Sequence, residues 1–170
     1  MSTATHAPIG PQLTNKEFVR ALLWHRLVNR IVTDLEFQQH FGHEDADMQH
    51  ELAERILDQT VGFLRLCAAE PDGGYSPSPL VDIGWHAFIL YTREYDAFCQ
   101  SVAGCFIHHC PTDENDTNSE DGVAHTVKAL RGRGLITDES LWTGAGTCGG
   151  KTCYSHCNQT KVVLSMHPTR

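Results

Sequence analysis

Residues 79–102 read PLVDIGWHAFILYTREYDAFCQSV, and this stretch decides the fold that the sequence predicts. Ser78 followed by Pro79 is typical of a helix start, because serine caps the first unpaired amides and proline fits the first helical position. Apolar residues then recur at helical spacing through most of the stretch. We therefore predict one long helix over residues 79–102, ended by Gly104.

Two further long helices are predicted before this stretch. Residues 15–33 have apolar side chains at helical spacing, with Asn15 as the expected N-cap. Residues 45–68 carry a second apolar stripe, and Asp58 is among the polar residues expected to face water. A shorter helix is predicted over residues 120–131, with a brief helical turn after it.

These helices predict an all-α fold. It would be a compact bundle of three long helices plus one or two short ones, followed by an irregular Gly- and Cys-rich C-terminal tail. We divide the chain into a flexible N-terminal arm (residues 1–14), a helical domain (15–143) and a Cys-rich tail (144–170).

The composition narrows the possible classes of function. The chain has 170 residues, of which 41% are hydrophobic, so one domain can bury a core. A net charge of −8 with only 13 Lys and Arg argues against a nucleic-acid-binding protein and against binding to an anionic membrane. The expected partners are a small-molecule or peptide substrate or another protein, and the sequence leaves the oligomeric state open.

The cysteines and the N-terminus predict a cytoplasmic location. No apolar signal-peptide segment precedes the first predicted helix, and no apolar run is long enough to span a bilayer. The seven cysteines are an odd number, which excludes complete internal pairing. We therefore expect the thiols to remain reduced and to serve as core residues, ligands or reactive groups.

One acidic residue and three histidines form the main candidate site. Asp82 and His86 lie four residues apart, so they share a face of the predicted helix, and Arg93 would lie on the same face. His108 and His109 follow just beyond the helix, and an extended backbone would direct only one of them toward His86. Two or three histidines with a carboxylate are typical of a catalytic zinc or non-haem iron site.

A structural interpretation of the same residues stays open. In it, Asp82 accepts a hydrogen bond from the His-His segment and holds that segment against the helix, with Trp85 as cover. Such a network satisfies buried polar groups without a metal.

The tail offers a second candidate metal site. Three thiols and one imidazole within ten residues could form a tetrahedral structural zinc site. The alternative is a tail with free or oxidisable thiols. The candidate ligands are Cys148, Cys153, His156 and Cys157.

The central stretch also resembles a known family. The motif consists of Val-Asp-x-x-Trp-His, then Thr-x-x-Tyr-x-x-Phe-Cys, then Phe-Ile-His-His-Cys-Pro, and it spans residues 81–111. It is similar to the bacterial branch of the glycine-rich-domain-containing-protein-like family, whose members often end in a Gly- and Cys-rich tail. This resemblance implies a helical fold and a site at the motif, and it implies no particular reaction. Relatives often have a second histidine where this chain has Phe88.

Two functions follow as hypotheses. The first is a small protein that binds zinc or, alternatively, iron, and in which Asp82, His86 and Arg93 would serve hydrolytic or oxidative catalysis. The sequence also leaves open that no metal is bound. Arg93 would hold an anionic substrate group. The second is a non-catalytic accessory or protein- or peptide-interaction module, in which the His and Asp network is structural. The sequence leaves open whether the protein is an enzyme.

Overall fold

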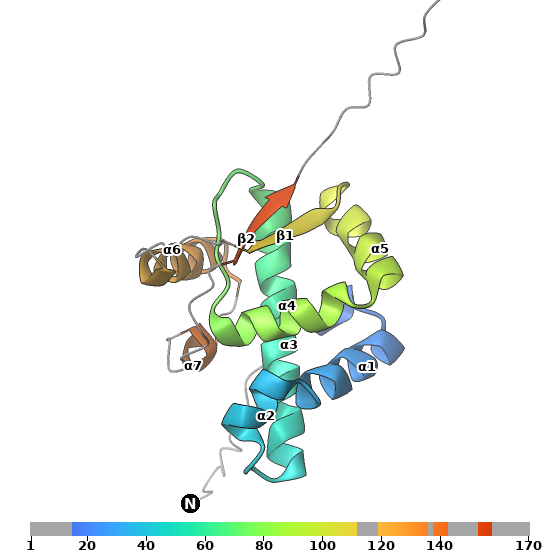
Figure 1. Cartoon of the computed structure of the whole chain (residues 1–170). Coiled ribbons are helices and arrows are strands. Elements are labelled where there is room, and N and C mark those ends of the chain that lie inside the picture. Colours follow the sequence, from blue (N-terminus) through green and yellow to red (C-terminus); the bar gives the residue numbers. More distant parts are fainter. Residues whose placement is uncertain (1–14, 112–118, 136–137, 143–152, 158–170) are drawn as a thin grey trace, which may run out of the picture.

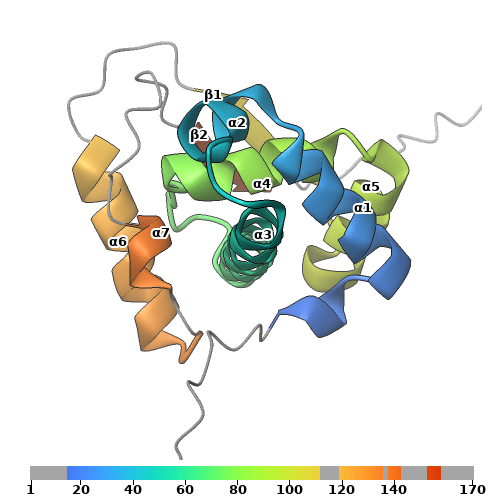
Figure 2. The same ribbon diagram turned by 90° about the horizontal axis from the view of Figure 1, so that it is seen from below.

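The structure is a computed structural model that describes residues 15–111, 119–135, 138–142 and 153–157. The fold is all-α, as predicted: a compact bundle of helices packs around the long helix α3, Ala46–Ala69. Figure 2 looks along α3 and shows α6 and α7 on one side, α1 and α5 on the other, and α4 crossing between them. The other helices are α1 (Ala21–Val32), α2 (Leu35–Phe41), α4 (Pro79–Ile89), α5 (Thr92–Ala103), α6 (Ser119–Gly132) and α7 (Glu139–Trp142).

The middle of α3 is buried on every side. Every residue from position 56 to position 64 is buried, whereas a helix on the surface would bury only one stripe. This explains why a single helix can hold the others together, since each neighbour packs its own apolar face against it. Asp45 caps the start of α3, with its carboxylate accepting from the Met48 amide.

The prediction that Asp58 of α3 faces water is wrong, and so is the predicted role of Asn15. Asp58 is only 2% exposed, because the chain before α1 lies over it. The backbone amide of Asn15 donates to the Asp58 carboxylate at 2.7 Å, and the Asn15 side chain does so at 3.1 Å. Asn15 caps no helix with its side chain; a short 3-10 turn, η1 (Lys16–Phe18), follows it and α1 begins only at Ala21. The buried carboxylate therefore fastens the start of the described chain to α3.

The helix predicted over residues 79–102 is two helices, α4 and α5. Ser78 caps α4 and Pro79 is its first residue, as predicted, but Tyr91 leaves the helical conformation with ψ of 61°. The break lets α5 fold back, so that Tyr95 and Phe98 pack against Phe88 of α4 with ring centroids 5.2 Å apart in each pair. Tertiary packing of aromatic rings therefore overrides the continuous helical period. Gly104 ends α5 with φ of 68°, as expected of a glycine cap.

Helices α3 and α4 approach each other closely at Gly84. A β-carbon at this position would lie 2.1 Å from Thr60 Oγ1, which real side chains do not tolerate. The Thr60 hydroxyl also lies 2.9 Å from the Val81 carbonyl oxygen of α4. The glycine therefore fixes the distance between α4 and the central helix, and with it the position of the residues that α4 carries.

A two-stranded antiparallel ribbon lies beside the helices. Strand β1 (Ile107–Pro111) pairs with β2 (Cys153–Cys157), as Figure 1 shows. In this pairing His108 is directly opposite His156. The C-terminal region was predicted to be irregular, and these five residues of it form a strand instead. Side-chain periodicity over so few residues gives little signal for a strand whose partner is distant in the sequence.

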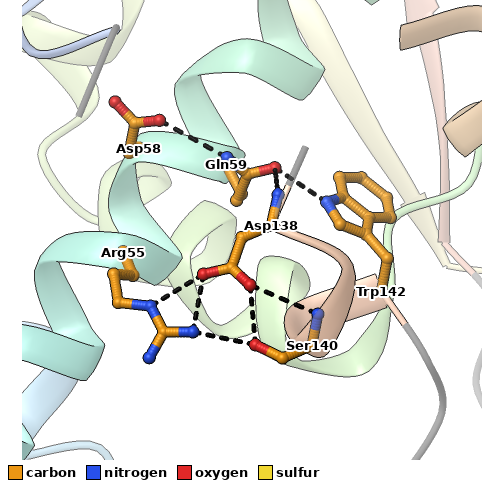
Figure 3. A network of polar contacts seen from close by, with 6 residues as sticks. All are labelled: Arg55, Asp58, Gln59, Asp138, Ser140 and Trp142. Carbon is orange, nitrogen blue, oxygen red and sulfur yellow. Dashed lines mark hydrogen bonds and ion pairs between the residues drawn. The ribbon is translucent and has the colours of Figure 1, made fainter. Parts of the chain in front are cut away.

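A polar network fastens α7 to α3 (Figure 3). The Gln59 side-chain oxygen accepts from Trp142 Nε1 at 2.9 Å and from the Asp138 amide at 3.0 Å. Arg55 Nε donates to the Asp138 carboxylate at 2.7 Å, and the Arg55 guanidinium also reaches Ser140. Trp142, which is buried, is thereby held against α3 near the end of the predicted helical domain.

Candidate metal centre

Helix α4 and strand β1 bring three potential ligands together. Asp82 and His86 lie one turn apart on α4, because residues four apart share a helix face. His109 comes from β1, and its Nε2 lies 2.8 Å from Asp82 Oδ1. His86 Nδ1 lies 3.7 Å from Asp82 Oδ2, which is beyond hydrogen-bond distance. One donor atom from each of the three residues lies within 4.8 Å of the others.

The cluster is sheltered at one end and open at the other. The side chains of His109 and Asp82 are 10% and 16% exposed, whereas that of His86 is 54% exposed. The two imidazole rings face each other, with centroids 4.6 Å apart. A ligand or ion would therefore reach the cluster from the side of His86, while Asp82 and His109 form its inner wall.

Aromatic residues of the core lie behind this inner wall. The Trp85 ring lies 4.3 Å from the His109 ring, centroid to centroid, and its indole N–H donates to the Tyr95 hydroxyl at 2.8 Å. The Tyr95 hydroxyl in turn donates to the Ile107 carbonyl of β1 at 2.7 Å. The sequence places Tyr95 on the apolar face of the predicted helix and within the family motif. The sequence carries no signal for its polar contacts, because these depend on the fold-back of α5.

The two adjacent histidines separate, and only one of them joins the cluster. His109 lies against Asp82, whereas His108 is exposed and packs its ring beside Phe106, with centroids 4.9 Å apart. Alternation of side chains along a strand accounts for the separation.

Arg93 does not share a helix face with Asp82. The prediction required one continuous helix, but the break before Thr92 puts Arg93 on α5, where it is exposed. Its expected role at the Asp82 site therefore loses its geometric basis.

The candidate tail site falls largely outside the described residues. Cys148 lies outside them. Cys153, His156 and Cys157 belong to β2, whose backbone alone is described and is paired with β1. Their proposed zinc site therefore stays a prediction. Cys105, just after α5, is disulfide-bonded, so the expectation that the thiols stay reduced is wrong for this residue.

The three central residues fit a divalent transition metal. Bonds of about 2.0–2.2 Å at a tetrahedral angle place two ligand atoms about 3.3–3.6 Å apart. The observed separations of 2.8 Å and 3.7 Å end on different oxygens of the Asp82 carboxylate, so side-chain rotations are needed to bring one oxygen and two imidazole nitrogens to that spacing. One donor atom from each residue already lies within 4.8 Å of the others. Two imidazoles and one carboxylate are also a donor set that zinc and iron(II) both accept.

Comparison with known proteins gives a family and no closer relative. No curated protein and no solved structure matches the chain.

None of the described helices has both the length and the apolar character needed to cross a membrane. The resemblance to the glycine-rich-domain-containing-protein-like family stays a prediction, because these comparisons do not test it. The UCP032817-like family matches residues 22–132, from α1 to α6, a stretch that includes Asp82, His86 and His109. The chain belongs to the UCP032817-like family.

Proposed function

We propose that this protein binds one divalent transition-metal ion through Asp82, His86 and His109. The observation that carries the proposal is the convergence of three donor atoms, from two separate elements of the fold, within 4.8 Å. Zinc is the first candidate and iron(II) the second, since both are bound by two histidines and one carboxylate. The exposure of His86 supports entry of the ion from solvent.

A catalytic role would extend this proposal. Three protein ligands leave coordination positions for a small molecule or peptide, and the bound ion would supply Lewis acidity for hydrolysis or, in the case of iron, redox chemistry. In this proposal Asp82 and His109 bind the ion from the buried side of the site, and His86 binds it from the solvent side. The cytoplasmic location stays part of this proposal; it rests on the N-terminal sequence, because the disulfide bond of Cys105 removes the argument from reduced thiols.

A second function is favoured by one contact. The 2.8 Å bond between His109 and Asp82 satisfies both groups with no ion present. The cluster would then be a structural link between α4 and β1 in a non-catalytic interaction module. The two functions differ in what Asp82→Ala does: loss of bound metal with the fold retained under the first, and loss of stability alone under the second.

Elemental analysis of the purified protein tests the proposal. The protein is prepared without a histidine tag, in zinc- and iron(II)-supplemented medium, as wild type, His86→Ala and His108→Ala. His108 is the matched control, because it is exposed on the strand that carries His109 but lies outside the cluster. We expect about one equivalent of metal in wild type and His108→Ala and a clear loss in His86→Ala. Metal retained in His86→Ala, or absent from the wild type, contradicts the proposal.

A further inference from the structure

The Tyr95 hydroxyl connects α5 to α4 and β1, the two elements that carry the residues of the cluster. It lies on α5, accepts from the indole N–H of Trp85 on α4, and donates to the carbonyl of Ile107 at the start of β1. Tyr95 is fully buried, as are Trp85 and Ile107. One hydroxyl therefore ties together the helix that carries Asp82 and the strand that carries His109.

On the strand side, α5 holds Ile107 through its carbonyl group, which accepts from the Tyr95 hydroxyl at 2.7 Å. His109 is two residues further along β1, and alternate residues of a strand share one face. Fixing Ile107 therefore fixes the point from which His109 extends toward Asp82.

On the helix side, Trp85 forms the surface on which the His109 ring rests. The two rings are 4.3 Å apart at an interplanar angle of 58°. The Trp85 ring also packs edge-to-face against Phe63, with centroids 5.3 Å apart, and its N–H donates to Tyr95. Loss of the Tyr95 hydroxyl would leave the indole N–H without this acceptor, and the ring would be freer to shift.

The hydroxyl keeps its proton under all ordinary conditions. Burial raises the pKa of Tyr95, so the group stays neutral and remains a hydrogen-bond donor. The hydroxyl therefore keeps the proton that it donates to Ile107 while groups at the surface titrate.

We propose that Tyr95 is a positioning residue, which sets the place and ring orientation of His109 relative to Asp82 and thereby the metal affinity of the cluster. The inference rests on the proposed metal binding and deepens it, because it names a residue that controls the site without contacting the ion. Groups that hydrogen-bond a metal ligand directly typically change metal affinity about 10- to 100-fold when they are removed; Tyr95 acts one contact further away, through Trp85 and Ile107, so we expect a change at the low end of that range.

Zinc titration of Tyr95→Phe against a matched control tests the inference. The control is Tyr75→Phe, because Tyr75 is also buried and its hydroxyl also donates a hydrogen bond, to Glu70, away from the cluster. We expect Tyr95→Phe to bind zinc about tenfold more weakly than wild type and Tyr75→Phe to bind it as wild type does. Equal zinc affinity in all three proteins, or an equal loss in both variants, overturns the inference.

A second readout in the metal-free protein separates this inference from the proposed function. NMR of the His109 ring nitrogens reports the tautomer and the hydrogen bond to Asp82. We expect these signals to move in Tyr95→Phe and to stay in place in Tyr75→Phe. If wild type binds no zinc, the metal-binding proposal fails, and unchanged His109 signals in Tyr95→Phe would overturn the positioning role as well.

A second variant keeps the test available if Tyr95→Phe does not fold. Trp85→Phe retains an aromatic ring beside His109 and removes the N–H that donates to Tyr95. We expect it to weaken zinc binding and shift the His109 signals in the same direction. Wild-type zinc affinity together with wild-type His109 signals in a folded Trp85→Phe protein overturns the inference.

Discussion

Replacing Gly84 with alanine should destabilise the protein, although alanine is normally the better helix former. The added β-carbon would lie 2.1 Å from Thr60 Oγ1, whereas ordinary contact begins at 3.4 Å, a shortfall of 1.3 Å. Thr60 cannot simply rotate away, because its hydroxyl lies 2.9 Å from both the Ile56 and Val81 carbonyl oxygens. The added carbon therefore pushes α4 outward, and this movement also breaks the hydrogen bond between Thr60 and the Val81 carbonyl of α4.

The change in the free energy of unfolding follows from two destabilising effects and one stabilising effect. Overpacking of this kind costs about 1–3 kcal/mol. Loss of the buried hydrogen bond adds about 1 kcal/mol. The higher helix propensity of alanine returns about 1 kcal/mol. We therefore expect Gly84→Ala to lower the free energy of unfolding by about 2 kcal/mol.

Denaturant unfolding monitored by circular dichroism measures this change. Gly132→Ala is the matched control, because a β-carbon at this α6 position meets nothing within 4 Å. A double-mutant cycle adds a sharper test: in a Thr60→Ala background, Gly84→Ala should cost less, since the nearest atom has been removed. Wild-type stability of Gly84→Ala, or the same cost in both backgrounds, would refute the reasoning.

Two further substitutions test contacts elsewhere in the fold. Burial of Glu54 opposes ionisation, but hydrogen bonds from Lys16 and Trp24 outweigh it and lower the pKa of the carboxyl in the folded protein below its ordinary 4.5. The ionised carboxylate therefore stabilises the fold above pH 4.5. This contribution is lost as the pH falls through the folded-state pKa. The melting temperature of Glu54→Gln should therefore vary less with pH in that range than the melting temperature of the wild type does. Gln59→Leu should lower the free energy of unfolding by about 1–3 kcal/mol, because the buried indole N–H of Trp142 loses its acceptor; an unchanged chemical-denaturation midpoint would contradict this.

Local signals in the sequence predicted the elements that depend on neighbouring residues. Ser78 and Pro79 predicted the start of α4, and Gly104 predicted the end of α5, because caps act over three or four residues. The four-residue spacing of Asp82 and His86 placed them on one helix face for the same reason.

Features set by tertiary packing could not be predicted in this way. The break between α4 and α5 contains no proline or glycine, and it exists because Tyr95 and Phe98 pack back onto Phe88. Burial of Asp58 depends on Asn15, 43 residues away. The pairing of β1 with β2 joins segments separated in the chain by α6 and α7, and the residue pattern of neither short segment indicates its partner.

A crystal structure of the protein grown with zinc, with anomalous data collected at the zinc absorption edge, tests the proposed metal site most directly. We predict an anomalous peak between Asp82, His86 and His109, about 2.0–2.2 Å from one nitrogen of each histidine and one carboxylate oxygen. The His109–Asp82 hydrogen bond would be replaced by two bonds to the ion. An occupied zinc site elsewhere in the molecule, with His109 Nε2 still at hydrogen-bond distance from Asp82, would contradict the proposal and leave the cluster as a structural link between α4 and β1.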